Sequence, residues 1–195
     1  MPLRDVDGPH VVCRAQYGPD PLFLPSFAPR FAAIRAPVPQ RSPFPGARTR
    51  LISGPALQLP MYQPENPDRS EAARDLVAQL ALADGIILGS PGYHGSISEL
   101  IKNALDYAED LRADIRPYFS GRAVGCIATA GGWPGAVNTL GALRDIVHAL
   151  RGWPTPLGAA INSSERVFDE HGECLVPRVA QILDVIADEV IDFLR

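Results

Sequence analysis

The stretch that most constrains the fold is residues 84–106, where a short apolar run meets a glycine- and proline-containing turn and then a helical pattern. The run from Gly85 to Leu88 predicts a buried parallel strand. The turn at 89–92 ends this strand, and a helix is expected to begin near Ser96. Because ligands bind at the carboxyl ends of strands in open α/β sheets, this junction is a candidate binding site.

The rest of the chain repeats this alternation of strand and helix. Capping boxes formed by Asp68 with Glu71 and by Ser96 with Glu99 predict the starts of two helices. The alternation indicates a parallel, doubly wound sheet. Strands are expected at 10–13, 49–52, 85–90, 123–128 and 157–161, and helices at about 68–83, 96–111, 136–150 and 176–194.

The N-terminal part differs in composition and in hydrophobic periodicity. Half of the 20 prolines lie at positions 1–46, and no periodicity is sustained there, which is typical of coil rather than of a long helix. We therefore divide the chain into an atypical proline-rich segment, 1–47, and an α/β domain, 48–195.

Composition excludes several classes of protein. A chain of 195 residues with 46% hydrophobic and 21% charged residues is typical of a globular protein with one domain. The net charge of −4 argues against nucleic acid or an anionic membrane as the main partner. No apolar run approaches the ~18–20 residues that span a bilayer. The N-terminus also lacks the apolar core of a secretory signal, so we expect a cytoplasmic protein.

The turn and the helix after it carry a longer pattern. Residues 91–96 read Pro-Gly-Tyr-His-Gly-Ser, and residues 102–106 read Lys-Asn-Ala-Leu-Asp. They resemble the NADPH-dependent FMN reductases of the flavodoxin-like superfamily, whose usual pattern is Pro-Glu-Tyr-Asn-Gly-Ser before a helix with Lys-Asn-Ala-Leu-Asp. The resemblance runs from about Arg48 to the C-terminus. It implies a flavodoxin-like three-layer α/β/α sandwich with a five-stranded parallel sheet.

The resemblance also implies where FMN binds. The turn at 91–96 would lie against the flavin ring, with Tyr93 near the ring, and the glycines after the next strand would approach the pyrimidine side. His94 either donates a hydrogen bond to the flavin or faces solvent, and Gly131-Gly132 taken alone is an ordinary turn. The residues expected to bind the cofactor are Ser90, Pro91, Gly92, Tyr93, His94, Gly95 and Ser96 in the first bend and Ala130, Gly131, Gly132 and Trp133 in the second.

The activity implied by the resemblance is hydride transfer from NADPH or NADH to FMN, and onward reduction of a quinone, a free flavin or another small acceptor. This step requires no protein acid or base, so no catalytic residue is assigned, and the four histidines have no metal-binding spacing. Family members commonly dimerise, so a homodimer or higher homo-oligomer is expected. The alternative is a non-enzymatic flavodoxin-like electron carrier, or an apo scaffold with impaired FMN binding.

The phosphate-binding loop of the family has no counterpart in this chain. The family loop resembles Gly-Ser-Leu-Arg-x-Gly-Ser, whereas residues 14–20 read Arg-Ala-Gln-Tyr-Gly-Pro-Asp. One hypothesis is that the N-terminal segment is partly an out-of-frame translation, because a GC-rich back-translation of 14–20, read two bases later, gives Gly-Ala-Val-Arg-Ser-Gly. The other is a diverged N-terminus that binds FMN weakly or not at all.

Overall fold

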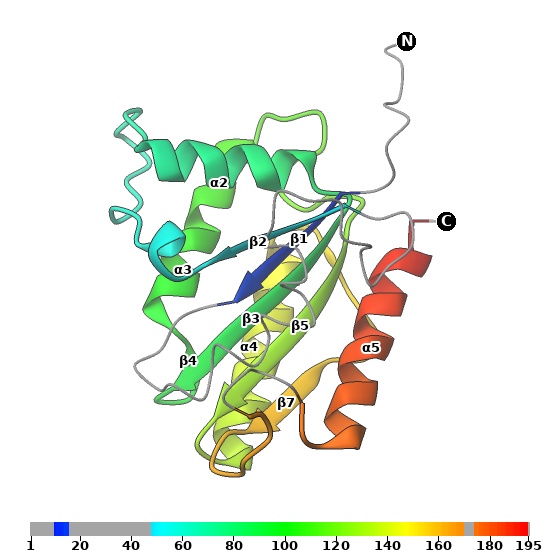
Figure 1. Cartoon of the computed structure of the whole chain (residues 1–195). Coiled ribbons are helices and arrows are strands. Elements are labelled where there is room, and N and C mark those ends of the chain that lie inside the picture. The colour runs from blue at the N-terminus through cyan, green and yellow to red at the C-terminus, as the bar shows by residue number, and fades with distance from the viewer. Residues whose placement is uncertain (1–9, 16–47, 170–173, 195) are drawn as a thin grey trace.

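The computed structural model describes residues 10–15, 48–169 and 174–194. One sheet runs through the middle of the molecule, with helices on both faces (Figure 1). No helix in the described ranges is both long and apolar enough to cross a membrane. In chain order the elements are β1 (His10–Ala15), β2 (Arg48–Ser53), the 3₁₀ helix η1 (Gly54–Leu57), α2 (Glu71–Leu82), β3 (Gly85–Tyr93), β4 (Ser96–Ile97), α3 (Glu99–Asp106), the 3₁₀ helix η2 (Tyr107–Leu111), β5 (Ala123–Ala130), α4 (Trp133–Ala149), β6 (Trp153–Pro154), β7 (Ala159–Asn162) and α5 (Pro177–Asp192).

The sheet differs from the expected five parallel strands. It has seven strands in the order β2-β1-β3-β5-β6, with β7 also paired to β5 and β4 paired to β3. It is mixed, because β4 folds back antiparallel to the end of β3. The last edge position is divided, since β6 pairs with Ala123 and Val124 while β7 pairs with the Ile127–Ala130 part of β5. The expectation of a purely parallel five-stranded sheet is therefore wrong.

Alternate side chains of the central strands enter two separate apolar layers. Ile86 and Leu88 of β3 pack in a cluster with residues of α2, α3 and α4, whereas Ile87 packs in a second cluster with residues of α5. Gly125 of β5 allows α5 to approach closely, because a Cβ at this position would lie 2.5 Å from Cγ2 of Ile186. The period of two along a strand thus explains how one short apolar run serves both faces.

Two helices begin two residues later than the capping boxes predict. The N-cap of α2 is Ser70, whose hydroxyl accepts a hydrogen bond from the backbone N–H of Ala73. The N-cap of α3 is Ser98, which likewise accepts from the N–H of Ile101. Both caps expected from the pattern, Asp68 and Ser96, are therefore wrong, because a serine directly before the first helical glutamate is better placed to cap the helix.

A buried arginine binds the C-terminal end of α2. Arg122 is fully buried and donates hydrogen bonds to the carbonyl oxygens of Ala83 at 2.7 Å, Ala81 at 2.9 Å and Tyr118 at 2.7 Å. Burial lowers the pKa of its guanidinium to about 10. These bonds satisfy carbonyls at the C-terminal end of α2, where a positive charge is favourable.

The strand β1 lies between β2 and β3 and pairs parallel with both. Residues 16–47, which follow it, are outside the described part of the chain. The phosphate-loop region and the out-of-frame hypothesis fall mostly on these residues, so both remain predictions, as does the domain boundary at 47–48.

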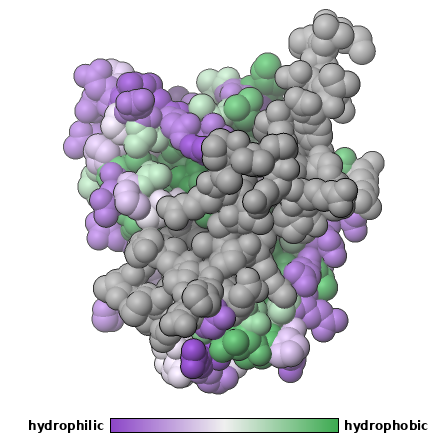
Figure 2. Space-filling model, in the orientation of Figure 1, coloured by the Kyte–Doolittle hydropathy of each residue, from purple (hydrophilic) through white to green (hydrophobic). Residues whose placement is uncertain are grey.

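Figure 2 shows hydrophilic residues gathered over the upper left, around the start of α2, where Glu71, Arg74 and Asp75 are exposed.

Candidate functional site

The first bend is a tight β-hairpin between β3 and β4. Tyr93 pairs with Ser96, so the loop contains only His94 and Gly95. Both have positive φ, 51° for His94 and 89° for Gly95. A two-residue hairpin loop with positive φ at both positions is the type I′ turn, which Asn-Gly usually forms. His94 therefore adopts the left-handed backbone conformation that suits the asparagine of the family pattern. Histidine is one of the residues enriched in this conformation.

The hairpin packs directly against the first half of α4. A Cβ placed on Gly92 would lie 2.3 Å from Oγ1 of Thr139 and 3.2 Å from the carbonyl oxygen of Gly135. The buried Thr139 hydroxyl also donates to the carbonyl of Ser96 at 3.3 Å. Glycine at position 92 is thus required by packing between the bend and the helix.

Ser90 supports the bend from within. It is fully buried, and its hydroxyl accepts a hydrogen bond from the N–H of Ser98 at 3.1 Å and donates to the carbonyl of Pro91 at 2.8 Å. The bond from Ser98 joins the end of β3 to the N-cap of α3, whereas the bond to Pro91 stays within β3. Because the Ser90 hydroxyl is already committed inside the protein, its contribution to a binding site is to hold the turn in place.

The second bend, after β5, is open where the first is packed. Among the described residues, no heavy atom lies within 4 Å of a Cβ placed on Gly131, and only Cδ of Pro134, at 3.9 Å, approaches one on Gly132. Gly132 is the N-cap of α4 and has no side chain to cap it. The first N–H groups of a helix need partners from outside the helix, and its N-terminus attracts negative charge. Within the described residues, this bend therefore combines space beside its glycines with a helix start that lacks a side-chain cap.

The sheet brings the two bends side by side. Pro91 at the end of β3 is in register with Thr129 near the end of β5, and the two strands end at the same edge (Figure 1). The first bend also approaches the helix that follows the second, because a Cβ placed on Gly92 would lie 3.2 Å from the carbonyl oxygen of Gly135. The two large aromatic side chains of the bends are both exposed, Tyr93 by 44% and Trp133 by 53%. The predicted site residues thus lie together at one edge.

The groups at this edge of the sheet suit a flat ligand ring that has polar atoms along one side. Two exposed aromatic side chains offer stacking surfaces, and glycine backbone with helix-terminal N–H groups offers donors. The described residues contain no group of three or more His, Cys, Asp or Glu that could hold a metal ion. The open glycines and the uncapped start of α4 fit a flavin, whose ring carries oxygen and nitrogen acceptors along one edge.

A groove of about 400 Å³ adjoins the first bend and was not predicted from the sequence. It lies between the bend, the segment after η1 and the start of α3. No periodicity could have found it, because it joins segments some forty positions apart. Its lining residues are Leu59, Met61, Tyr93, Ser98, Glu99, Leu100 and Asn103.

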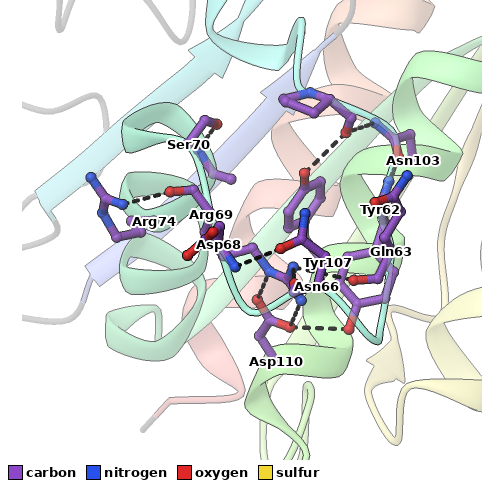
Figure 3. A network of polar contacts seen from close by, with 12 residues as sticks. Tyr62, Gln63, Asn66, Asp68, Arg69, Ser70, Arg74, Asn103, Tyr107 and Asp110 are labelled. Carbon is purple, nitrogen blue, oxygen red and sulfur yellow. Dashed lines mark hydrogen bonds and ion pairs between the residues drawn. The ribbon is translucent and has the colours of Figure 1, made fainter.

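Asn103 fixes one wall of this groove. Its amide accepts from the N–H of Tyr62 at 2.8 Å and donates to the carbonyls of Leu59 at 3.3 Å and Pro60 at 3.0 Å (Figure 3). The asparagine of the Lys-Asn-Ala-Leu-Asp pattern therefore anchors the segment that leads into α2. By contrast, Lys102 and Asp106 of the same pattern form an exposed i,i+4 ion pair.

An arginine–aspartate pair holds the same segment from its other side. Arg69 donates two hydrogen bonds to the carboxylate of Asp110, at 2.7 and 2.9 Å, and its guanidinium lies 4.8 Å from the centre of the Tyr62 ring. Tyr62 donates its hydroxyl to the same carboxylate at 3.0 Å, and Figure 3 shows these side chains converging. The bonds from Arg69 lower the pKa of Asp110, while burial and the bond to Asp110 raise the pKa of Tyr62.

Solved structures share this architecture. FerB, a flavoenzyme NAD(P)H:(acceptor) oxidoreductase from Paracoccus denitrificans, superposes with a TM-score of 0.70 at 20% identity and covers 95% of this chain and 96% of its own. A flavodoxin, WrbA-like protein from Agrobacterium tumefaciens superposes with a TM-score of 0.52 at 19% identity, over 93% of this chain and 99% of its own. These likenesses show a flavodoxin-like α/β fold.

Sequence comparisons identify the protein family. The model of the NADPH-dependent FMN reductase family matches residues 25–165, and the chain belongs to this family. An FMN-dependent NADPH-azoreductase from Staphylococcus aureus is 39% identical over 99 residues, which are 51% of this chain and 49% of the relative. The chain thus spans about half the length of the curated relatives it matches.

Proposed function

We propose that this protein is an FMN-dependent NAD(P)H oxidoreductase that reduces a small acceptor. When bound, FMN supplies the redox chemistry: it takes a hydride from NAD(P)H and passes two electrons to an acceptor A, with the net reaction NAD(P)H + H⁺ + A → NAD(P)⁺ + AH₂. The observation that carries the proposal is the junction of a packed hairpin with an open, uncapped glycine bend at one edge of the sheet. Membership of the FMN reductase family supports it.

The residues of the two bends have separate tasks in this proposal. Tyr93 and Trp133 flank the ring and limit the access of water to it. The N–H groups of Gly131 and Gly132 approach the polar edge of the ring, where donors favour the reduced, negatively charged form. His94 and Gly95 set the shape of the hairpin through their backbone, and the buried hydroxyl of Ser90 holds it to α3.

No side chain of the bends needs to transfer a proton for the hydride step, so the set of catalytic side chains is empty in this proposal. The names of relatives support the class of acceptor: the Staphylococcus aureus protein is named an azoreductase, and FerB is named for an unspecified acceptor. We propose a quinone, a free flavin or a similar aromatic compound as the acceptor, with residues 48–195 as the main functional domain.

We also propose a homodimer and a cytoplasmic location. Trp133 and Val137 lie one turn apart on α4 and are more than half exposed, as apolar residues of a subunit interface would be in an isolated chain. Sedimentation velocity of the wild type and of Val137→Glu tests the homodimer: a dimer that dissociates in the variant is expected, and a monomeric wild type contradicts the proposal.

A cytoplasmic location suits an enzyme that draws on the cellular NAD(P)H pool, and fractionation of cells tests this location.

An anaerobic titration tests the redox proposal. FMN is added to the purified chain, unbound flavin is removed, and absorbance near ~450 nm is followed after addition of NADPH and then of a quinone. The expected result is retained flavin that bleaches with NADPH and recovers its colour with the quinone. Retained flavin that ignores NADPH would instead indicate an electron carrier, and a colourless protein would indicate a scaffold; either result overturns the proposal.

A further inference from the structure

The groove beside the first bend has the size and lining of a small-molecule site. Its volume of about 400 Å³ is within the range of ligand pockets, roughly 300–1,000 Å³. Leu59, Met61 and Leu100 give it an apolar lining, and Tyr93 belongs both to the groove and to the flavin-facing hairpin. A ring that occupied the groove would therefore lie next to the proposed cofactor.

We propose that this groove binds the aromatic ring of the acceptor and that Glu99 at its rim selects acceptors with a positively charged substituent. The inference rests on the proposed function for its link to catalysis, although the binding preference itself is independent of FMN. Met61 is 63% exposed at the mouth of the groove, and its flexible thioether suits a site that takes rings of different shape.

Charge complementarity gives the sign of the preference. Among the residues that the structure describes, none forms an ion pair with Glu99, which is exposed. The acidic residues further along the same stretch are already neutralised, Asp106 by Lys102 and Asp110 by Arg69. Within the described part of the chain, Glu99 is thus the one carboxylate of the groove lining and has no ion-pair partner, so it attracts cations and repels anions.

The remaining polar residues of the groove do not compete for this role. The Asn103 amide is used by the backbone of the segment before α2, and the Ser98 hydroxyl caps α3. Both side chains are also buried, with 3% of Ser98 and 5% of Asn103 exposed, so Glu99 is the accessible polar group. Selectivity is therefore left to the apolar lining and to Glu99.

A matched pair of ligands tests the preference at equilibrium. Two naphthoquinones that differ only in carrying a trimethylammonium or a sulfonate group are titrated into the purified chain, and the ratio of their dissociation constants is measured. Glu99→Gln is expected to reduce the preference for the cationic quinone by about three- to fivefold at low salt, with a smaller effect in high salt. Met61→Lys is expected to shift the preference toward the sulfonate.

Glu71→Gln is the control for Glu99→Gln. Both glutamates are exposed, and each is the first residue of a helix whose N-cap is a serine, so the loss of helix stabilisation is the same. Glu71 lines no part of the groove, and its variant is expected to keep the wild-type ratio. An equal effect of both variants, or no effect of Glu99→Gln and Met61→Lys, overturns the inference.

Two further readouts separate the groove from the cofactor and from self-association. In steady-state kinetics, kcat/KM for the cationic quinone is expected to fall in Glu99→Gln relative to kcat/KM for the sulfonated quinone. If NADPH fails to bleach the wild type, the proposed function fails, and the equilibrium ratios still decide the groove. If Met61→Lys changes the sedimentation coefficient and leaves both quinones unbound or equally bound, the groove is an interface between copies, and the inference is wrong.

Discussion

The two bends at the carboxyl edge of the sheet are built in opposite ways. The hairpin at Pro91–Ser96 is packed against α4, closed by a two-residue turn and anchored by the buried hydroxyl of Ser90. The bend at Ala130–Trp133 has open space beside its glycines and a helix start without a side-chain cap. The first bend satisfies its own packing and hydrogen bonds, whereas the second has no packing partner beside Gly131 and no side-chain cap among the described residues.

The contrast shows that glycine serves two purposes in one site. At position 92 it removes a steric conflict with α4, and at position 131 it leaves room that none of the described residues fills. A glycine-rich turn is therefore not evidence of ligand approach until its surroundings are known. Substitutions that treat the two glycines alike should give opposite results.

The largest effect on stability is expected from Gly92→Ala. Its Cβ would lie 2.3 Å from Oγ1 of the buried Thr139, so the hairpin must move away from α4. We expect the free energy of unfolding to fall by about 2–3 kcal/mol, as in other overpacked cores. Gly131→Ala, with no atom within 4 Å of the new Cβ, should change it by no more than about 0.5 kcal/mol. Urea denaturation of both variants without FMN measures the difference, and equal losses would remove the contrast between the bends.

A somewhat smaller loss is expected from Asp110→Asn, which extends the comparison to the segment behind the hairpin. The substitution removes the carboxylate that accepts two hydrogen bonds from Arg69 and one from Tyr62. We expect a loss of about 1–3 kcal/mol at pH 7. Arg122→Met, far from the groove, is a useful comparison for stability loss without any change in the groove.

The pH dependence of this variant has a definite sign. Hydrogen bonds from Arg69 hold the pKa of Asp110 below its usual value in the folded protein. Its contribution is therefore complete above the unfolded pKa of about 4 and is lost as the pH falls toward the lower, folded value. Wild-type protein should lose more stability than Asp110→Asn when urea denaturation is moved from pH 7 to pH 3. Parallel losses in the two proteins would contradict the assigned pKa shift.

The smallest effects are expected at the tip of the hairpin. His94→Asn should change the free energy of unfolding by less than about 0.5 kcal/mol, because asparagine also tolerates positive φ. His94→Val should cost about 1–2 kcal/mol, because a β-branched residue is strained there. Thermal unfolding of the two variants separates a backbone role from a side-chain role. A large loss of stability in His94→Asn would show that the imidazole itself is needed.

Much of the fold could be predicted because local sequence patterns determine where strands, helices and turns form. Apolar runs such as Gly85–Leu88 mark strands that both layers cover, and the breaks after them mark the bends. The N-caps at Ser70 and Ser98 were missed because two capping residues lie near each start, Asp68 and Ser70 before α2 and Ser96 and Ser98 before α3, and only backbone geometry decides between them. The hairpin was missed because His-Gly is a weaker turn signal than Asn-Gly.

The groove and its support were beyond prediction for a different reason. Asn103 reaches Leu59 and Pro60, and Arg69 reaches Asp110, across some forty positions of sequence. Contacts of that range follow from the packing of α3 beside the segment before α2, which no local pattern encodes. The eleven residues predicted for the cofactor site do converge at one edge of the sheet, and their contact with flavin remains a prediction.

The most direct test is a fluorescence titration of FMN into three proteins: wild type, Gly131→Leu and Gly141→Leu. In the part of the chain that the structure describes, neither glycine has an atom within 4 Å of an added Cβ, but Gly141 lies about two turns into α4, on its exposed side. The account predicts saturable binding of equal affinity for wild type and Gly141→Leu, and at least about tenfold weaker binding for Gly131→Leu, whose side chain fills the crevice. Equal binding by all three proteins, or no saturable binding by the wild type, would contradict it.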